Sequence, residues 1–373
     1  MKINTSIKWY NHTIVEVLSA FLAAFLVVYL IQNTLNYLWI LAVVLLLAIY
    51  YYQLRFTNWL FWVGFIPRFI ALFYVTEYVQ GYKNIYIPGI LMHHNTPPFV
   101  QNLTAKNLPA LEDSYQKWII EILNNQPYST SVFLGPLKII FSYLLTSVKN
   151  TVLSFFIVKL VLLIVEVLLY QTSVKMLERY KLSAKNILWY WANPLVFALI
   201  YFYGAVDVIA LFFLVLSLHY FAVVQDIKAG WYWFLAIIFQ PLTLIFSPII
   251  LLKLQNFRRN KVILLSLLFL AISYFPFYQF LPLVLSSESD KWNIINQWAT
   301  KNLMLEIGLL ISVLLINFLI GLKFKYHNRL DLLKVLFFTT LLSYLFVPEL
   351  NITFLIFPLF FAVFTLKIPT QKS

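Results

Sequence analysis

Residues 113–137 read DSYQKWIIEILNNQPYSTSVFLGPL and separate two strongly apolar parts of the chain. Between Leu111 and Asn124, apolar side chains recur at helical spacing, with Lys117 and Glu121 on the opposite face. This pattern predicts an amphipathic helix that lies on a membrane surface. Hydrophobicity does not explain the carboxylate of Asp113 where the helix begins, so that residue is a candidate for chemistry.

The composition is that of an integral membrane protein. Of 373 residues, 62% are hydrophobic and 11% are charged, whereas a soluble domain has about 25% charged residues. Aromatic residues make up 19% of the chain, which suits the aromatic belts found at membrane interfaces. There is no cysteine, which excludes disulfides, thiol nucleophiles and cysteine metal sites.

Twelve apolar segments are candidates for membrane spans, each of which needs about 20 residues. They are 13–32, 35–53, 58–76, 131–148, 151–171, 187–203, 205–224, 230–252, 261–283, 303–323, 330–346 and 350–367. Only helices satisfy their own backbone in lipid at this hydrophobicity. We therefore predict an all-α, polytopic transmembrane bundle of about 11–13 helices, in a single domain over residues 1–373.

The net charge of +13 comes mostly from lysine and arginine in short loops. Such loops stay on the cytoplasmic side, so membrane lipids are expected partners and nucleic acid is not. If every segment crosses in turn, residues 77–130 form a large extracytoplasmic loop. The same path, however, places the basic stretch 172–186 outside and Asp207 inside.

A second chain path keeps the basic stretch 172–186 inside and Asp207 outside. In this path the segment 230–252 turns back at Gln240-Pro241, because proline breaks helices. One segment between 131 and 171 must then be re-entrant or broken. The bias of lysine and arginine favours this second path, and residues 77–130 remain extracytoplasmic in it.

Two motifs carry a resemblance to a known family. The ordered series Asp113, Tyr115, Trp118, Pro127-Tyr128 and Gly135-Pro136-Leu137 resembles the first extracytoplasmic loop of the GT-C glycosyltransferases. The series Asn193-Pro194-Leu195, Gly204 and Asp207 resembles a second GT-C element, in the style of the bacterial and GPI-type mannosyltransferase branch. Two departures are Gly135, where proline is usual, and Ala205, where a polar residue is usual.

The resemblance implies a membrane glycosyltransferase whose first loop bears amphipathic helices. It would transfer a hexose such as mannose from a polyprenyl-phosphate donor to a lipid, glycan or polymer acceptor. The active site would face outward from the plasma membrane, and the composition suits a bacterium. Asp113 would be the catalytic base that takes the acceptor's proton, with Tyr115 and Tyr128 in the substrate site; the alternative for Asp113 is a helix N-cap.

Four further residues are candidates for binding the donor or acceptor. Arg68 lies inside an apolar segment and would contact the donor phosphate, or else snorkel or form a buried pair. Lys138 would meet the same phosphate or snorkel. Asp207 opens a membrane helix and is a functional candidate by position, with an N-cap as the alternative. Glu349 is an acidic residue before the last helix, or only an interfacial loop acid.

No cofactor is expected with certainty. A divalent metal would be compatible with the class, but no clear site exists, since the adjacent His93 and His94 do not share a helix face and have no third ligand nearby.

Two other functions stay open. A polytopic transporter or lipid-linked sugar flippase would explain charges within apolar segments at Arg68, Lys159 and Glu166, although Lys159 and Glu166 are expected to pair with neighbouring helices. An O-antigen-type polymerase or ligase ranks third, because that class usually relies on arginines in its outer loops. The loop 77–130 contains none.

Overall fold

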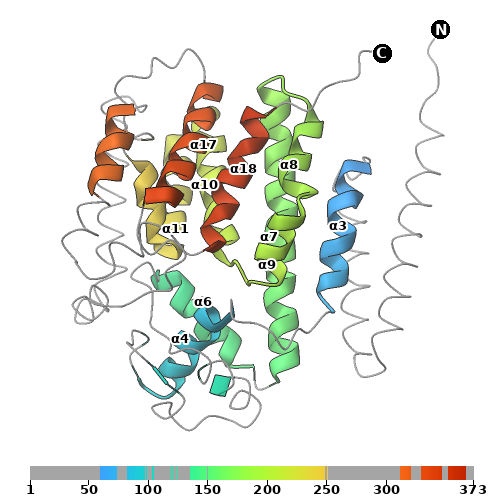
Figure 1. The fold of residues 1–373 in the computed structure, drawn as a ribbon, viewed down its shortest axis with the longest axis vertical. Coiled ribbons are helices and arrows are strands. Elements are labelled where there is room, and N and C mark those ends of the chain that lie inside the picture. The colour runs from blue at the N-terminus through green and yellow to red at the C-terminus, as the bar shows by residue number, and fades with distance from the viewer. Residues whose placement is uncertain are drawn as a thin grey trace.

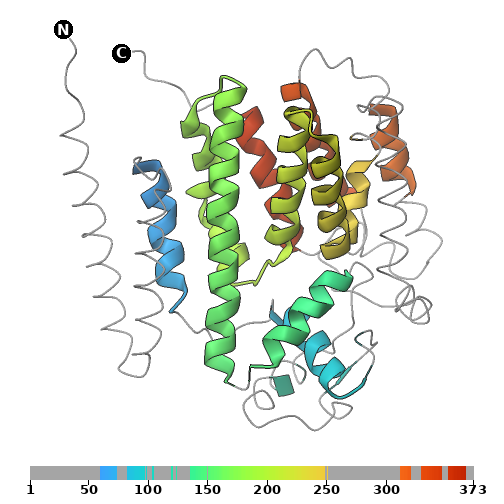
Figure 2. The same ribbon diagram turned by 180° about the vertical axis from the view of Figure 1, so that it is seen from behind.

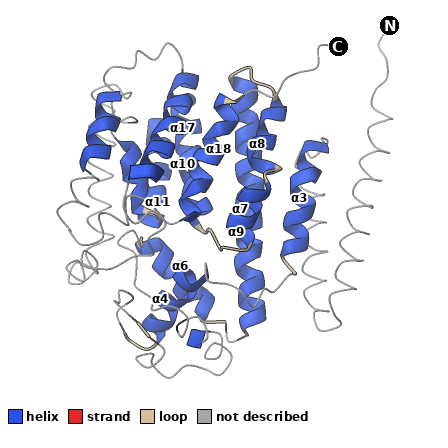
Figure 3. Cartoon of the chain, viewed as in Figure 1, coloured by secondary structure: helices blue, strands red, loops and turns tan. Residues whose placement is uncertain are grey.

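The computed structural model describes residues 59–73, 82–96, 98, 103–104, 119–120, 123, 135–148, 150–247, 250, 311–320, 329–346 and 352–366. These residues form helices and the turns between them, and none of them forms a strand (Figure 3). The all-α class predicted from hydrophobicity is therefore confirmed for this part of the chain.

The main body is a bundle of helices that run side by side (Figures 1 and 2). Its members are α3 (Trp59–Ala71), α7 (Thr151–Arg179), α8 (Leu188–Trp191), α9 (Pro194–Tyr201), α10 (Asp207–Ala222), α11 (Asp226–Phe239), α17 (Arg329–Phe346), α18 (Ile356–Thr365) and the helix Ile311–Ile320. Short 3-10 helices connect them: η4 (Ala184–Ile187), η5 (Pro241–Phe246) and η7 (Ile352–Leu355).

Helix α7 is the axis of the described bundle. Its 29 residues span about 43 Å at 1.5 Å per residue, more than the ~30 Å hydrocarbon core of a bilayer. Among the described helices it is the one both long and apolar enough to cross a membrane; the other apolar helices searched, such as α3 and α10, are shorter. The polytopic transmembrane arrangement stays a prediction.

Two helix breaks follow from local chemistry. Asn193 ends the α8 segment, and its side chain accepts a hydrogen bond from the backbone N–H of Leu195, so Pro194 starts a new helix. Helix α11 ends at Phe239, and residues from Pro241 continue as a 3-10 helix. Since proline has no backbone N–H, the break predicted at Gln240-Pro241 is confirmed.

One predicted span has a different form. Helix α6 (Pro136–Thr146) has 11 residues and lies with α4 (Lys83–His93) at one end of the bundle, instead of running alongside α7 (Figures 1 and 2). The α6 segment is short because Asn150 starts a new helix, accepting a hydrogen bond from the backbone N–H of Leu153. The described residues of the candidate span 131–148 therefore form a short helix, the broken form that the second chain path expects of one segment between 131 and 171.

The α4–α6 pair is relevant to the two chain paths, and the choice between them stays a prediction. Helix α3 ends, and α7 begins, at the end of the bundle where this pair lies (Figures 1 and 2). The described residues between 131 and 171 thus include a helix of 11 residues, fewer than the about 20 that a span needs, as the second path expects. Helix α7 ends at the opposite end of the bundle from the α4–α6 pair, whereas α10 begins, at Asp207, next to this pair (Figures 1 and 2).

Candidate functional site

A buried polar cluster forms where α6, α10 and η7 meet. The Lys138 ammonium lies 3.0 Å from Oδ1 of Asp207. The hydroxyl of Thr353 donates to Oδ2 of the same carboxylate at 2.9 Å. The side chains of Lys138 and Asp207 are only 11% and 6% exposed, so each charge depends on the other for compensation. We refer to these residues as the Lys138–Asp207–Thr353 cluster.

The turn before Asp207 has a strict local requirement. Gly204 has φ +64°, and a Cβ there would come within 2.9 Å of the Tyr82 ring. The Tyr82 hydroxyl in turn donates to the carbonyl oxygen of Tyr201 at 3.2 Å. A glycine is needed both for the positive φ and for the close approach. Thus Tyr82, just before α4, holds the turn that delivers Asp207.

The N-terminus of α6 is positioned by a second glycine. A Cβ at Gly135 would overlap the carbonyl oxygens of Ile238 and Phe239 at the end of α11. Pro136 then begins the helix at a position where its missing N–H costs nothing, and Lys138 follows within the first turn. Gly135 therefore has a packing reason: any residue with a Cβ would collide there.

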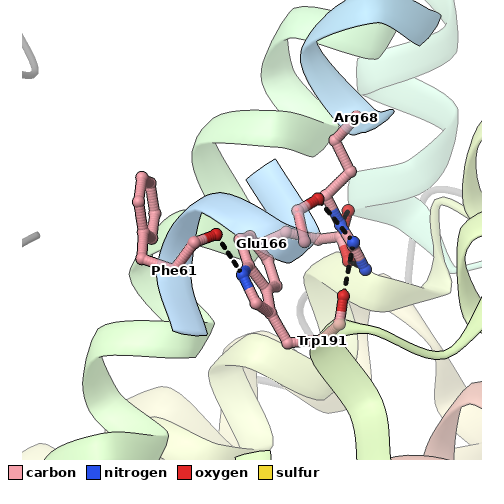
Figure 4. Close-up of polar contacts among 5 residues, drawn as sticks. Phe61, Arg68, Glu166 and Trp191 are labelled. Atoms are coloured by element: carbon pink, nitrogen blue, oxygen red, sulfur yellow. Dashed lines mark hydrogen bonds and ion pairs between the residues drawn. The ribbon is translucent and has the colours of Figure 1, made fainter. Parts of the chain in front are cut away.

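A second buried ion pair joins α3 to α7 (Figure 4). Arg68 donates from Nε and Nη2 to the two carboxylate oxygens of Glu166, at 2.9 and 3.0 Å. Its Nη1 donates to the carbonyl oxygens of Gly64 and Trp191, at 2.9 and 2.7 Å. The residues Arg68 and Glu166 are 1% and 0% exposed. The pair is bidentate, the strongest geometry for a guanidinium and a carboxylate.

Trp191 completes this network from α8. The guanidinium carbon of Arg68 lies 4.2 Å from the centre of the Trp191 ring, within cation–π range. The indole N–H of Trp191 donates to the carbonyl oxygen of Phe61 at 2.8 Å, as Figure 4 shows. A Cβ at Gly64 would overlap Trp191. Helices α3, α7 and α8 therefore meet around one buried charge.

These contacts change the interpretation of Arg68. Of its alternatives, the structure shows the buried pair, and all three guanidinium nitrogens already donate within the protein. A contact with the donor phosphate would require breaking this pair, so we place Arg68 in the helix interface. Glu166 pairs across helices as predicted, and the Lys159 ammonium likewise donates to the carbonyl oxygen of Ala71 at 3.1 Å.

His93 links the two end helices. Its Nε2 lies 3.2 Å from the carbonyl oxygen of Tyr143 and 3.3 Å from the hydroxyl of Ser147. Its ring stacks on that of Tyr143, with centres 4.2 Å apart. Within the described ranges, no group of three His, Cys, Asp or Glu residues is placed to hold a metal ion.

Four predicted site residues lie outside the described part of the chain: Asp113, Tyr115, Tyr128 and Glu349. Of the amphipathic helix predicted after Asp113, the described residues Ile119 and Leu123 are helical and buried. The sequence predicted Lys138 and Asp207 as binding residues, and the structure places these two side chains in contact.

Two contributors to the site were missed from the sequence. Thr353 gave no signal beyond its place just after Glu349, before the last helix. The helix α4 was missed because Pro88 and Gly89 interrupt its sequence, and both disfavour helix interiors. Gly89 is tolerated since a Cβ there would overlap the backbone of Ser142 in α6.

Comparison with known proteins found no matching family model, no similar curated protein and no similar solved structure. The two motif regions and the cluster they form therefore carry the functional argument.

Proposed function

We propose that this protein is a membrane glycosyltransferase of GT-C type. It transfers a hexose from a polyprenyl-phosphate sugar to a lipid, glycan or polymer acceptor on the extracytoplasmic face of a bacterial plasma membrane. The proposal rests first on the resemblance of the two motifs, one ending at Leu137 and the other at Asp207.

The observation that carries the proposal is the meeting of Lys138 with Asp207. These residues lie 69 positions apart in the sequence. Lys138 directly follows the Gly135-Pro136-Leu137 element, and Asp207 ends the second motif. Thr353 comes from a third segment, directly after the acidic loop at Glu349 that was independently a candidate. Two residues chosen for their chemistry thus meet, and a third segment contributes Thr353 to the same point.

The chemistry of the cluster suits a phosphate-linked donor. An ammonium group has three N–H donors, and Lys138 directs one at Asp207. Within the described residues its other donors have no partner; in this proposal they contact a phosphate oxygen, and Asp207 keeps the lysine oriented. The acceptor hydroxyl then attacks the anomeric carbon while Asp113 takes its proton. The bond from the anomeric carbon to the phosphate oxygen breaks, and its electron pair leaves with the polyprenyl phosphate.

The distribution of charge supports an outward-facing site. Lys175 and Arg179 lie in the last turns of α7, at the end of the bundle opposite the α4–α6 pair (Figures 1 and 2). Basic residues at short connections favour the cytoplasmic side. With that end inside, the end carrying α4 and α6 faces outward, where lipid-linked sugars are used by enzymes of this class.

The buried charges do not support the alternative function as a transporter. Arg68 and Glu166 compensate each other, and Lys159 donates to the backbone of α3. These contacts join α3 to α7, as a stable helix interface requires, and they account for the three charges without a transport path.

The proposal is tested by assaying purified protein with radiolabelled polyprenyl-phosphate sugars and membrane extract as acceptor. We expect Asp113→Asn to lower transfer by about 10²–10⁴-fold, the usual contribution of a general base, while donor binding persists. A matched control is Asp331→Asn, which removes a carboxylate from the first turn of α17 and should leave transfer unchanged. Transfer by Asp113→Asn at the wild-type rate, or no transfer by the wild type with any such donor, would contradict the proposal.

A further inference from the structure

Positive charges converge at the end of the bundle opposite the α4–α6 pair. Lys175 and Arg179 are four residues apart on α7, so they share one face of that helix. Both are exposed, and His219 lies in the last turn of α10, which ends at the same end of the bundle (Figures 1 and 2). Helices α7 and α10 pack against each other. We call Lys175, Arg179 and His219 the basic site.

The basic site has unused hydrogen-bonding capacity. Within the described residues, neither Lys175 nor Arg179 takes part in an ion pair or hydrogen bond. Nδ1 of His219 is buried and has no hydrogen-bond partner there. The nearby carboxylate of Glu178 is exposed and forms no ion pair within the same residues. Within the described residues no carboxylate pairs with these groups, so a bound anion would be attracted to them.

The surroundings of the basic site are both aromatic and aliphatic. The ammonium of Lys228 lies 5.5 Å from the centre of the Tyr220 ring, which stacks on Tyr232 at 5.3 Å. On the same two helix ends, Ile227 is 74% exposed and Trp231 is 47% exposed. Exposed aliphatic and tryptophan side chains next to cations are typical of the level of lipid headgroups.

We propose that the basic site binds the phosphate of an anionic phospholipid headgroup. Lys175 and Arg179 contact the phosphate oxygens, and the exposed Ile227 and Trp231 lie against the acyl chains. The cytoplasmic leaflet, where the positive-inside rule places this end, carries the anionic lipids. The inference is independent of sugar transfer and requires only that the bundle lies in a bilayer.

The test uses the full-length protein in a neutral detergent, titrated with phosphatidylglycerol while thermal unfolding is followed. Selective binding to the folded state raises the Tm, and the dependence on lipid concentration yields an apparent Kd. Phosphatidylcholine and inorganic phosphate serve as the comparison ligands. We expect a rise with phosphatidylglycerol that neither of the other two produces.

The decisive variant is Lys175→Gln combined with Arg179→Gln, whose exposed positions should not disturb folding. Each of the two residues makes a charge-assisted hydrogen bond to the phosphate, which contributes about tenfold to binding, so the apparent affinity should fall roughly a hundredfold. The control, Lys181→Gln with Lys185→Gln, removes the same charge from the turn after α7 and should retain the affinity within about threefold. Lys175→Arg should retain it as well.

Three outcomes would overturn the proposal. The first is a wild-type protein that does not distinguish phosphatidylglycerol from phosphatidylcholine. The second is an equal loss of affinity in the control variant, which would indicate diffuse attraction at this end of the bundle. The third is stabilisation by inorganic phosphate alone, which would indicate an anion site with no preference for lipid.

Discussion

Removal of the Arg68–Glu166 pair should be the most destabilising single perturbation among the described charges. The pair is bidentate, is at most 2% exposed in either side chain, and joins α3 to α7. Arg68→Met keeps much of the volume of the side chain but leaves the Glu166 carboxylate buried without a counter-charge. Breaking a buried pair in this way costs about 3–5 kcal/mol of folding free energy.

The substitution of the partner, Glu166→Gln, should cost less folding free energy than Arg68→Met. In Glu166→Gln the guanidinium keeps its hydrogen bonds to the carbonyl oxygens of Gly64 and Trp191 and its position over the Trp191 ring. The loss is then about one hydrogen bond involving a charged group, or 1.5–3 kcal/mol. The double variant should be less destabilised than the sum of the two by about 2 kcal/mol or more, since neither charge is left unpaired.

The measurement is a double-mutant cycle on unfolding in detergent, followed by tryptophan fluorescence; the chain has 11 tryptophans. Lys334→Met is the control, because that cation is 46% exposed and its pair with Asp331 is 3.9 Å long. It should change stability by under about 0.5 kcal/mol. Arg68→Met costing less than about 1 kcal/mol, or a coupling near zero, would refute the packing role. If Arg68→Met instead weakens donor binding and leaves the free energy of unfolding unchanged, Arg68 belongs to the donor-binding site.

Two further predictions concern the α4–α6 end of the bundle. Lys138→Met should lower sugar transfer by about 10²-fold, as loss of a group that stabilises developing charge does, and should weaken donor binding. Transfer kinetics check this, and the control Asn84→Ala, at a half-buried position in the first turn of α4, should have no such effect. Gly89→Ala should destabilise the protein by about 1–3 kcal/mol, the usual cost of overpacking, because its Cβ would overlap the backbone of Ser142. A Tm for Gly89→Ala equal to that of the wild type would show that α4 and α6 do not pack this closely.

Sequence reasoning predicted features that depend on the local backbone. The helical class follows from hydrophobicity, since a long apolar chain must satisfy its own peptide groups. The break after Gln240 follows from Pro241, which lacks an N–H. The start of α9 at Asn193-Pro194 has an equally local signal, a cap followed by a residue suited to the first turn, but it was missed because 187–203 was predicted as one segment. Each of these signals acts within a few residues, so one stretch of sequence contains it.

Tertiary structure decided the pairing of charges. Arg68 was equally compatible with a lipid phosphate and with a buried partner, and nothing local selects Glu166, 98 residues away. The contact of Lys138 with Asp207 likewise depends on the close approach of α6 to the end of α11 at Gly135. The short form of α6 was hidden by the apolar residues on both sides of it. Hydrophobicity measures how much a segment avoids water, but not whether it crosses a bundle or packs across its end.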